Sequence, residues 1–91
     1  MDLLEKHPTP HPQVASRIVD GEALIVLADS GEVTVLNKVG SRIWELVDGS
    51  RSVQGIVETI EAEYDTTREQ AEQDVVRFVQ ELIDNKMLLV D

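Results

Sequence analysis

The segment from Glu32 to Gly49 changes its residue pattern at Asn37, and this change constrains the fold more than any other feature. The β-branched run before Asn37 is typical of a short strand. Asn37 itself is a favoured N-cap, and the apolar spacing after it is helical. Gly49 suits the position just beyond a helix end. We therefore expect a strand that turns directly into a helix, whose apolar face consists of Val39, Ile43, Leu46 and Val47.

Two further strands are predicted before this one. Residues 14–19 form the first, and Asp20-Gly21 is a dipeptide that commonly closes hairpins. Residues 23–28 are a continuous apolar run, which indicates the central and most buried strand. A second turn with Gly31 leads into the third strand, residues 32–36. Three antiparallel strands with tight turns form a meander, in which the third strand is an edge.

Two more helices are predicted after the first. Ser52 is the N-cap of the second helix, whose apolar face includes Ile56 and Ile60. The third begins at Thr66 or Thr67, since both match the capping-box spacing, and it runs to about Asn85. The apolar tail, residues 87–90, either adds a strand or packs on the third helix. The predicted class is α+β, with a three-stranded antiparallel sheet followed by three helices.

The chain has 91 residues, which suits one domain. Its first part contains Pro8, Pro10 and Pro12, each of which restricts the backbone to extended conformations. We expect residues 1–13 to form a flexible, proline-rich arm and residues 14–91 to form the domain. Leu3 and Leu4 in the arm can dock on the body or on a neighbouring chain.

The charge balance disfavours several classes of partner. Lys+Arg number 8 against 18 Asp+Glu, a net charge of −10. Such a chain repels phosphate backbones and anionic membranes, so neither nucleic acid nor membrane is expected as a partner. No apolar stretch approaches the length of a membrane span, and the N-terminus lacks the pattern of a secretory signal. The chain has no cysteine, which fits a cytoplasmic protein.

No arrangement of residues indicates catalysis. His7 and His11 have the spacing of helical metal ligands, but Pro8 and Pro10 prevent a helix there. The serines lack a nucleophile motif, and the carboxylates fall mostly on the polar faces of the second and third helices. We therefore expect no enzyme activity, no metal site and no cofactor.

The third helix has an apolar sector wider than a core stripe. Its expected core residues are Ala71, Val75, Phe78 and Leu82, and Val76, Val79 and Ile83 widen the sector to about 160°. Two interpretations fit this width. The extra flank either covers the sheet and the C-terminal tail, or it lines a groove beside the edge strand.

The edge strand is open to pairing by an added peptide. Natural edges are usually blunted by lysine, proline or a bulge, and this strand has only one charge. An extended peptide can add to such an edge and place alternate side chains in a groove. The strand residues of this predicted site are Glu32, Val33, Thr34, Val35 and Leu36. Its helical wall consists of Val75, Val76, Val79 and Ile83, with Asp74 and Arg77 at the rim.

An ordered set of motifs over residues 14–90 resembles the PqqD-like family. The motifs are Leu36-Asn37-x-x-Gly40, Ile43-Trp44 before Asp48-Gly49, Ser52-Val53-x-x-Ile56-Val57, Tyr64, and Asp74-Val75 before Phe78-Val79 and Leu82. The resemblance implies a winged-helix-like fold that binds a leader peptide as an added strand, with the third helix as the other wall. The resemblance implies recognition, without catalysis, of ribosomally made precursor peptides, and the chain most resembles stand-alone recognition proteins of lasso-peptide pathways.

Two positions depart from the family pattern. An aromatic residue often found in the third strand is absent, and Asn85-Lys86 replaces a glycine after the third helix. The implied partners are a precursor (leader) peptide and a leader peptidase or other modifying enzyme. An alternative is a partner of a radical SAM enzyme in quinone-cofactor biosynthesis. A winged-helix DNA-binding regulator is a third possibility, which the acidic third helix disfavours.

Overall fold

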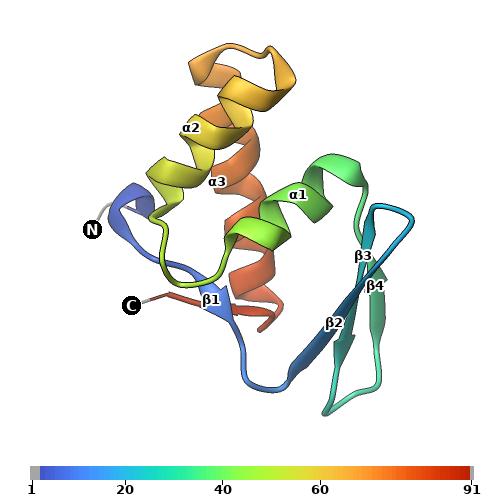
Figure 1. The fold of residues 1–91 in the computed structure, drawn as a ribbon. Coiled ribbons are helices and arrows are strands. Elements are labelled where there is room, and N and C mark those ends of the chain that lie inside the picture. The colour runs from blue at the N-terminus through green and yellow to red at the C-terminus, as the bar shows by residue number, and fades with distance from the viewer. Residues whose placement is uncertain (1–2, 91) are drawn as a thin grey trace.

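The computed structural model describes residues 3–90, and in it a small sheet is followed by three helices (Figure 1). The sheet has the order β2-β3-β4, with strands Val14–Val19, Glu22–Leu27 and Val33–Val35. The helices are α1 (Lys38–Leu46), α2 (Val53–Tyr64) and α3 (Arg68–Asp84). A 3-10 turn, η1 (Leu3–Glu5), and strand β1 (Thr9–Pro10) precede the sheet, and β5 (Leu88–Leu89) follows α3. The predicted α+β class and element order are confirmed.

The first hairpin has the turn that its sequence predicts. Val19 pairs with Glu22, and both residues between them have positive φ, 52° at Asp20 and 80° at Gly21. That geometry is a type I′ turn, whose twist matches the flanking strands. Because side chains alternate along a strand, one face of β3 presents Ala23 and Ile25 toward α1, where both are fully buried.

Each helix begins where a side chain caps it. Asn37, Ser52 and Thr67 accept hydrogen bonds from the backbone N–H groups three residues later. Thr67 is therefore the cap of α3, which decides between the two predicted starts. α1 ends at Leu46. After α3, Lys86 takes the left-handed conformation, with φ of 62°.

The core lies where α1, α2 and α3 meet one face of β3. Its α3 contribution is Ala71, Val75, Val79 and Leu82, all of which are buried. Trp44 of α1 and Ile56 of α2 pack into the same cluster. Within residues 3–90, no helix combines the length and apolar composition needed to cross a membrane.

The N-terminal segment lies against the helical part of the protein. The carbonyl oxygens of Lys6 and Pro8 accept hydrogen bonds from Val53 and Gly49, at 2.9 and 3.0 Å. Strand β1 pairs with β5, so the C-terminal tail adds a strand. Leu3 and Leu4 pack on the core, which is the first of the two docking options expected for them. The division of the chain at residue 14 stays a prediction.

One buried hydroxyl connects α1 to the sheet. Leu36 N–H donates to Ala23 O at 2.9 Å, as in an ordinary ladder. The reciprocal bond is replaced by Ser41, whose Oγ accepts from Ala23 N–H at 2.7 Å and donates to Leu36 O at 3.2 Å. The hydroxyl thus occupies the place where the chain leaves β4 and turns into α1.

Replacing this serine should destabilise the protein. Ser41→Ala leaves the buried Ala23 N–H without a partner, which costs roughly 1–3 kcal/mol. The free energy of unfolding by urea measures this loss. Ser50→Ala is the matched control, since it removes an exposed hydroxyl that donates to Asp48, and about 0.5 kcal/mol or less is expected. Equal losses in the two variants would contradict this role of Ser41.

Candidate functional site

Strand β4 is an edge of the sheet with polar backbone groups facing outward. Leu27 N–H donates to Glu32 O, and Leu36 N–H donates to Ala23 O. In an antiparallel pair these bonded positions alternate along the strand. The backbone N–H and C=O groups of Thr34, which lies between Glu32 and Leu36, therefore also face β3. The N–H and C=O groups of Val33 and Val35 therefore point away from the sheet. They offer two donors and two acceptors in the spacing that an added strand requires.

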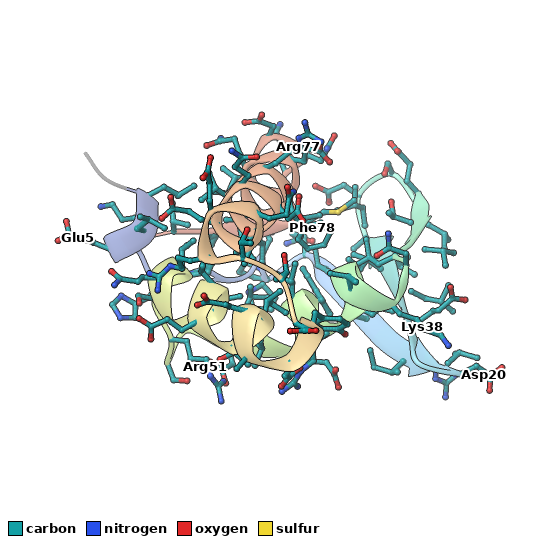
Figure 2. All side chains as sticks on the ribbon, turned by 90° about the horizontal axis from the view of Figure 1, so that it is seen from above. Glu5, Asp20, Lys38, Arg51, Arg77 and Phe78 are labelled. Atoms are coloured by element: carbon teal, nitrogen blue, oxygen red, sulfur yellow. The ribbon has the colours of Figure 1, made fainter. Side chains whose placement is uncertain are left out.

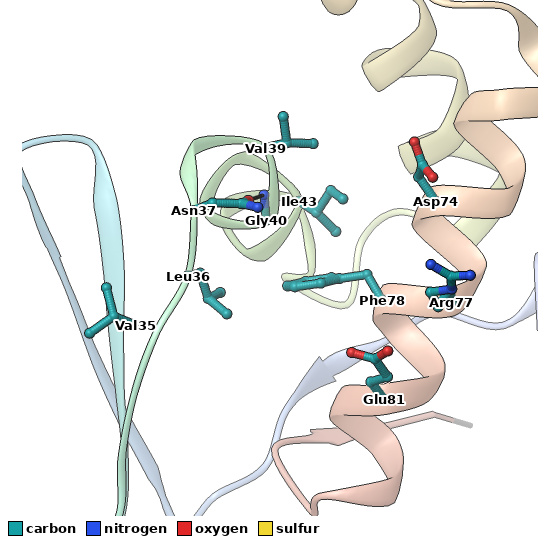
Figure 3. A pocket seen from close by; sticks show the side chains of 10 residues that line it. All are labelled: Val35, Leu36, Asn37, Val39, Gly40, Ile43, Asp74, Arg77, Phe78 and Glu81. Carbon is teal, nitrogen blue, oxygen red and sulfur yellow. Dashed lines mark hydrogen bonds between the residues drawn. The ribbon is translucent and has the colours of Figure 1, made fainter.

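A groove runs between this edge and α3 (Figure 3). Its main part has a volume of about 510 Å³. The lining residues are Val35, Leu36, Asn37, Val39, Gly40, Ile43, Asp74, Arg77, Phe78 and Glu81. A second hollow of about 280 Å³ includes Thr34 and shares Leu36, Phe78 and Glu81 with the first. The two hollows thus form one groove that follows β4.

Phe78 forms the apolar wall on the α3 side. Figure 3 shows its ring extending from α3 toward α1, close to Leu36 and Gly40. A Cβ atom added to Gly40 would lie 3.0 Å from Phe78 Cε1, closer than ordinary van der Waals contact. The absence of a side chain at Gly40 therefore lets the ring lie against α1. Figure 2 shows the same ring between α3 and the sheet, with Arg77 at the outer side of α3.

Charged side chains form the rim of the groove above this apolar wall. Asp74, Arg77 and Glu81 lie along one side of α3, with Arg77 between the two carboxylates (Figure 3). Gln70 donates to Asp74 at 2.9 Å. Exposed ion pairs of the kind that such side chains form with a ligand add little affinity, because water screens them.

Two carboxyl groups with perturbed titration lie outside the groove. A bidentate hydrogen bond from Arg42, at 2.8 and 2.7 Å, lowers the pKa of Glu63. Hydrogen bonds from the Ser50 hydroxyl and backbone N–H lower the pKa of Asp48. Among residues 3–90, no cluster of three or more histidine and carboxylate side chains has the geometry to hold a metal ion.

The groove is lined by some residues of the predicted site and not by others. Asp74 and Arg77 lie at its rim as expected. Val75 and Val79 are fully buried in the core and do not line it. Val76 lies on another side of α3, beside Leu3 and Leu4, and Ile83 packs against the core. None of Val75, Val76, Val79 and Ile83 lines the groove, where Phe78 takes the position expected for Val79. Contact of those four residues with a peptide stays a prediction.

The strand half of the predicted site has its residues on different faces. Val33 and Val35 are 60% and 58% exposed, and their side chains lie on the sheet face opposite to the core. Thr34 contributes to the smaller hollow with Glu32, and the buried Leu36 lines both hollows. Sequence reasoning missed Asn37, Gly40 and Ile43 as lining residues. The sequence feature that could have identified them is the Leu36-Asn37-x-x-Gly40 motif, which places the N-cap of α1 and a glycine beside the edge strand β4.

Comparisons with known proteins agree with this architecture. The family model described as coenzyme PQQ synthesis protein D (PqqD) matches residues 22–88. The solved structure "TbiB1 in Complex with the TbiA(beta) Leader Peptide" is 31% identical, with a TM-score of 0.83, covering 88% of this chain and 93% of that chain. "Lasso peptide synthetase B1 complexed with the leader peptide" is 24% identical with a TM-score of 0.83, covering 91% and 98%, and it shares the fold. No protein of curated function matches significantly.

Two glycines at equivalent helix positions test the contact with Phe78. Gly40 and Gly55 are each the third helical residue, and each donates its N–H to the N-cap side chain. An added Cβ at Gly55 would meet Ser52 Oγ at 3.6 Å, an ordinary distance. Gly55→Ala should therefore stabilise the protein by about 0.5 kcal/mol through helix propensity. Gly40→Ala should be at least about 1 kcal/mol less favourable, because the Phe78 ring must move.

Urea unfolding of both variants measures this difference. The same pair made in a Phe78→Leu background should differ less, since the crowded ring atoms are gone and only the 3.2 Å approach of the added Cβ to Asn37 Oδ1 remains. If the difference persists in full in that background, the ring contact is not its cause.

Proposed function

The chain belongs to the PqqD family, and from this premise we propose that it binds the leader segment of a ribosomally made precursor peptide. The single observation that carries the proposal is the open β4 edge beside a groove with an apolar wall and a charged rim. The TbiB1 protein, at 31% identity over most of both chains, was solved with a leader peptide bound. Leader binding requires both features together, because an edge alone attracts any extended strand.

The binding mode is an added strand along β4. The outward groups of Val33 and Val35 supply backbone hydrogen bonds, which do not depend on the sequence of the peptide. Every second side chain of the added strand would then face α3. Apolar side chains there pack against Leu36, Ile43 and Phe78. Those near the rim meet Asp74, Arg77 and Glu81, which favours one charge pattern over others.

The proposed role is delivery of the precursor to a separate leader peptidase or other modifying enzyme. The ten residues that line the main groove include no serine, histidine or cysteine, and the proposal assigns no chemical step to this chain. Holding the leader raises the local concentration of the precursor near its enzyme. We assign this step to the cytoplasm, where ribosomes make the precursor.

A lasso-peptide precursor is the first candidate within this class. The motifs resemble those of stand-alone recognition proteins from lasso pathways, and the protein described as lasso peptide synthetase B1 shares the fold. The quinone-cofactor alternative has no specific support in the groove. Titration with synthetic leader peptides of the two classes separates these alternatives. Tighter binding of a quinone-pathway precursor would favour that alternative.

Proline substitutions test the backbone contacts. Val33→Pro and Val35→Pro each remove an N–H that points outward, so each should weaken leader binding at least tenfold, about 1.4 kcal/mol. Calorimetric titration measures the dissociation constant, and circular dichroism checks folding. Ser16→Pro is the matched control, because Ala28 N–H donates to Gln13 O and the alternation then places the Ser16 N–H at the opposite free edge. Unchanged affinity in folded Val33→Pro and Val35→Pro variants would reject the added-strand mode.

The apolar wall is tested by truncating the aromatic ring. Phe78→Ala removes the largest apolar surface of the groove and should also weaken leader binding at least tenfold. Tyr64→Ala is the control, since Tyr64 is an exposed aromatic residue at the end of α2, outside the groove. If Phe78→Ala stays folded and binds the leader like the parent, the specificity site lies elsewhere.

A further inference from the structure

The groove beside β4 continues past the start of that strand into a third hollow. This hollow has a volume of about 300 Å³, and it shares Leu27, Glu32 and Asn85 with the hollow that includes Thr34. It lies where the turn between β3 and β4, the end of α3 and the segment before β2 come together. We call it the polar end of the groove. Its lining residues are His11, Gln13, Leu27, Ala28, Asp29, Ser30, Glu32, Asn85 and Lys86.

The polar end differs in chemistry from the rest of the groove. Near α1 the groove is lined by the apolar side chains of Leu36, Ile43 and Phe78. In the middle, Phe78 is joined by the buried Leu82 and Met87. The polar end instead presents mainly charged and hydrogen-bonding side chains. A peptide in the groove therefore meets apolar surface over most of its length and polar surface at one end.

The register of an added strand fixes the spacing between these two kinds of surface. Side chains directly opposite one another on neighbouring strands share a face of the sheet. Peptide residues opposite Val33 and Val35 therefore point to the face away from the core, and those opposite Glu32, Thr34 and Leu36 point into the groove. The side chains that face Leu36 and Thr34 reach the apolar surface. The next one, which faces Glu32, reaches the polar end.

The charged groups around this last position are mainly acidic. Asp29 and Glu32 on the turn and Glu81 on α3 supply carboxylates, and Lys86 supplies an ammonium group. His11 accepts a backbone N–H at Nδ1, over 3.0 Å, so its ring adds no positive charge. Within residues 3–90, none of the three carboxylates is in an ion pair. Their charges are therefore available to a ligand.

We propose that the polar end is the subsite for a basic side chain of the leader, a lysine or an arginine. The proposal rests on the proposed function and names the class of leader that this chain selects. Such a leader has apolar side chains facing Leu36 and Thr34, and a basic one at the next alternate position, facing Glu32. The same carboxylates disfavour a leader with an acidic residue at that position.

The test is a charge scan of the leader against variants of the full chain. Synthetic leader peptides carry Lys or Glu at one position at a time, and calorimetry gives the dissociation constant of each. Glu32→Lys reverses a charge at the polar end and keeps the backbone hydrogen bonds that residue 32 makes to Leu27 and Ser30. Glu22→Lys is the matched control. It makes the same change at the exposed first residue of β3, outside the groove lining.

The expected result is one leader position at which the parent prefers Lys over Glu at least fivefold, because the exchange replaces attraction to carboxylates by repulsion. The preference should disappear or reverse in Glu32→Lys and persist in Glu22→Lys. It should also weaken as NaCl is raised from about 0.05 to about 0.5 M, since salt screens exposed charges. Aspartate placed two or four residues from that position, on one side of it, should weaken binding at least tenfold, because those side chains face Phe78.

Three outcomes would overturn the proposal. If the parent binds leader but no position shows a preference for Lys that depends on Glu32, the polar end is no subsite for a basic side chain, and the proposed function stands. If a position instead prefers Glu, and Lys86→Gln removes that preference, the polar end binds an acidic side chain. Absence of leader binding by the parent rejects the proposed function itself, and this subsite with it.

Discussion

The position of α1 against the sheet depends on the hydroxyl of Ser41. It is 2% exposed, and it bridges Ala23 N–H and Leu36 O where β4 ends. Without this bridge, the buried Ala23 N–H would lose its partner, and the hydrogen bonds that join α1 to the end of the sheet would be lost. The neighbouring Gly40 lies on the groove side of the same helical turn. The groove between β4, α1 and α3 therefore takes its shape from how one turn of α1 attaches to the sheet.

Gly40 and Phe78 define the floor and wall of the groove together. Neither residue by itself indicates a binding site, since glycine is tolerated near a helix start and phenylalanine is common on an amphipathic helix. Their close approach joins α1 to α3 across the groove and holds the ring in a fixed position. A ring held in this way presents apolar surface to a ligand with little loss of conformational freedom on binding. The strand itself contributes Val33, Thr34 and Val35, so among the lining residues of the groove the aromatic surface comes from Phe78.

The sequence predicts most of the fold because its signals are local. Asn37, Ser52 and Thr67 cap the helices, and Asp20-Gly21 closes a hairpin. Local signals do not decide which side chains of α3 face the core. From Val75, a core stripe can continue at Phe78 or at Val79, because helical neighbours lie three or four residues apart. The choice depends on the space beside Gly40, which is a tertiary contact, so the sequence alone does not predict that Phe78 and not Val79 lines the groove.

A small chain with one core must leave part of its sheet uncovered. A domain of about this length buries only roughly 60–70% of the surface that its unfolded chain exposes. Here α1 packs on the inner face of β3, and the opposite face of the sheet stays uncovered. Of the described strands, β4 thus keeps a free edge and contributes to an uncovered face. Such surfaces invite indiscriminate aggregation. The net charge of −10 opposes that outcome, because copies of the chain repel one another while an edge and a face stay open. The acidic composition therefore works against self-association, while the exposed valines of the sheet stay uncovered.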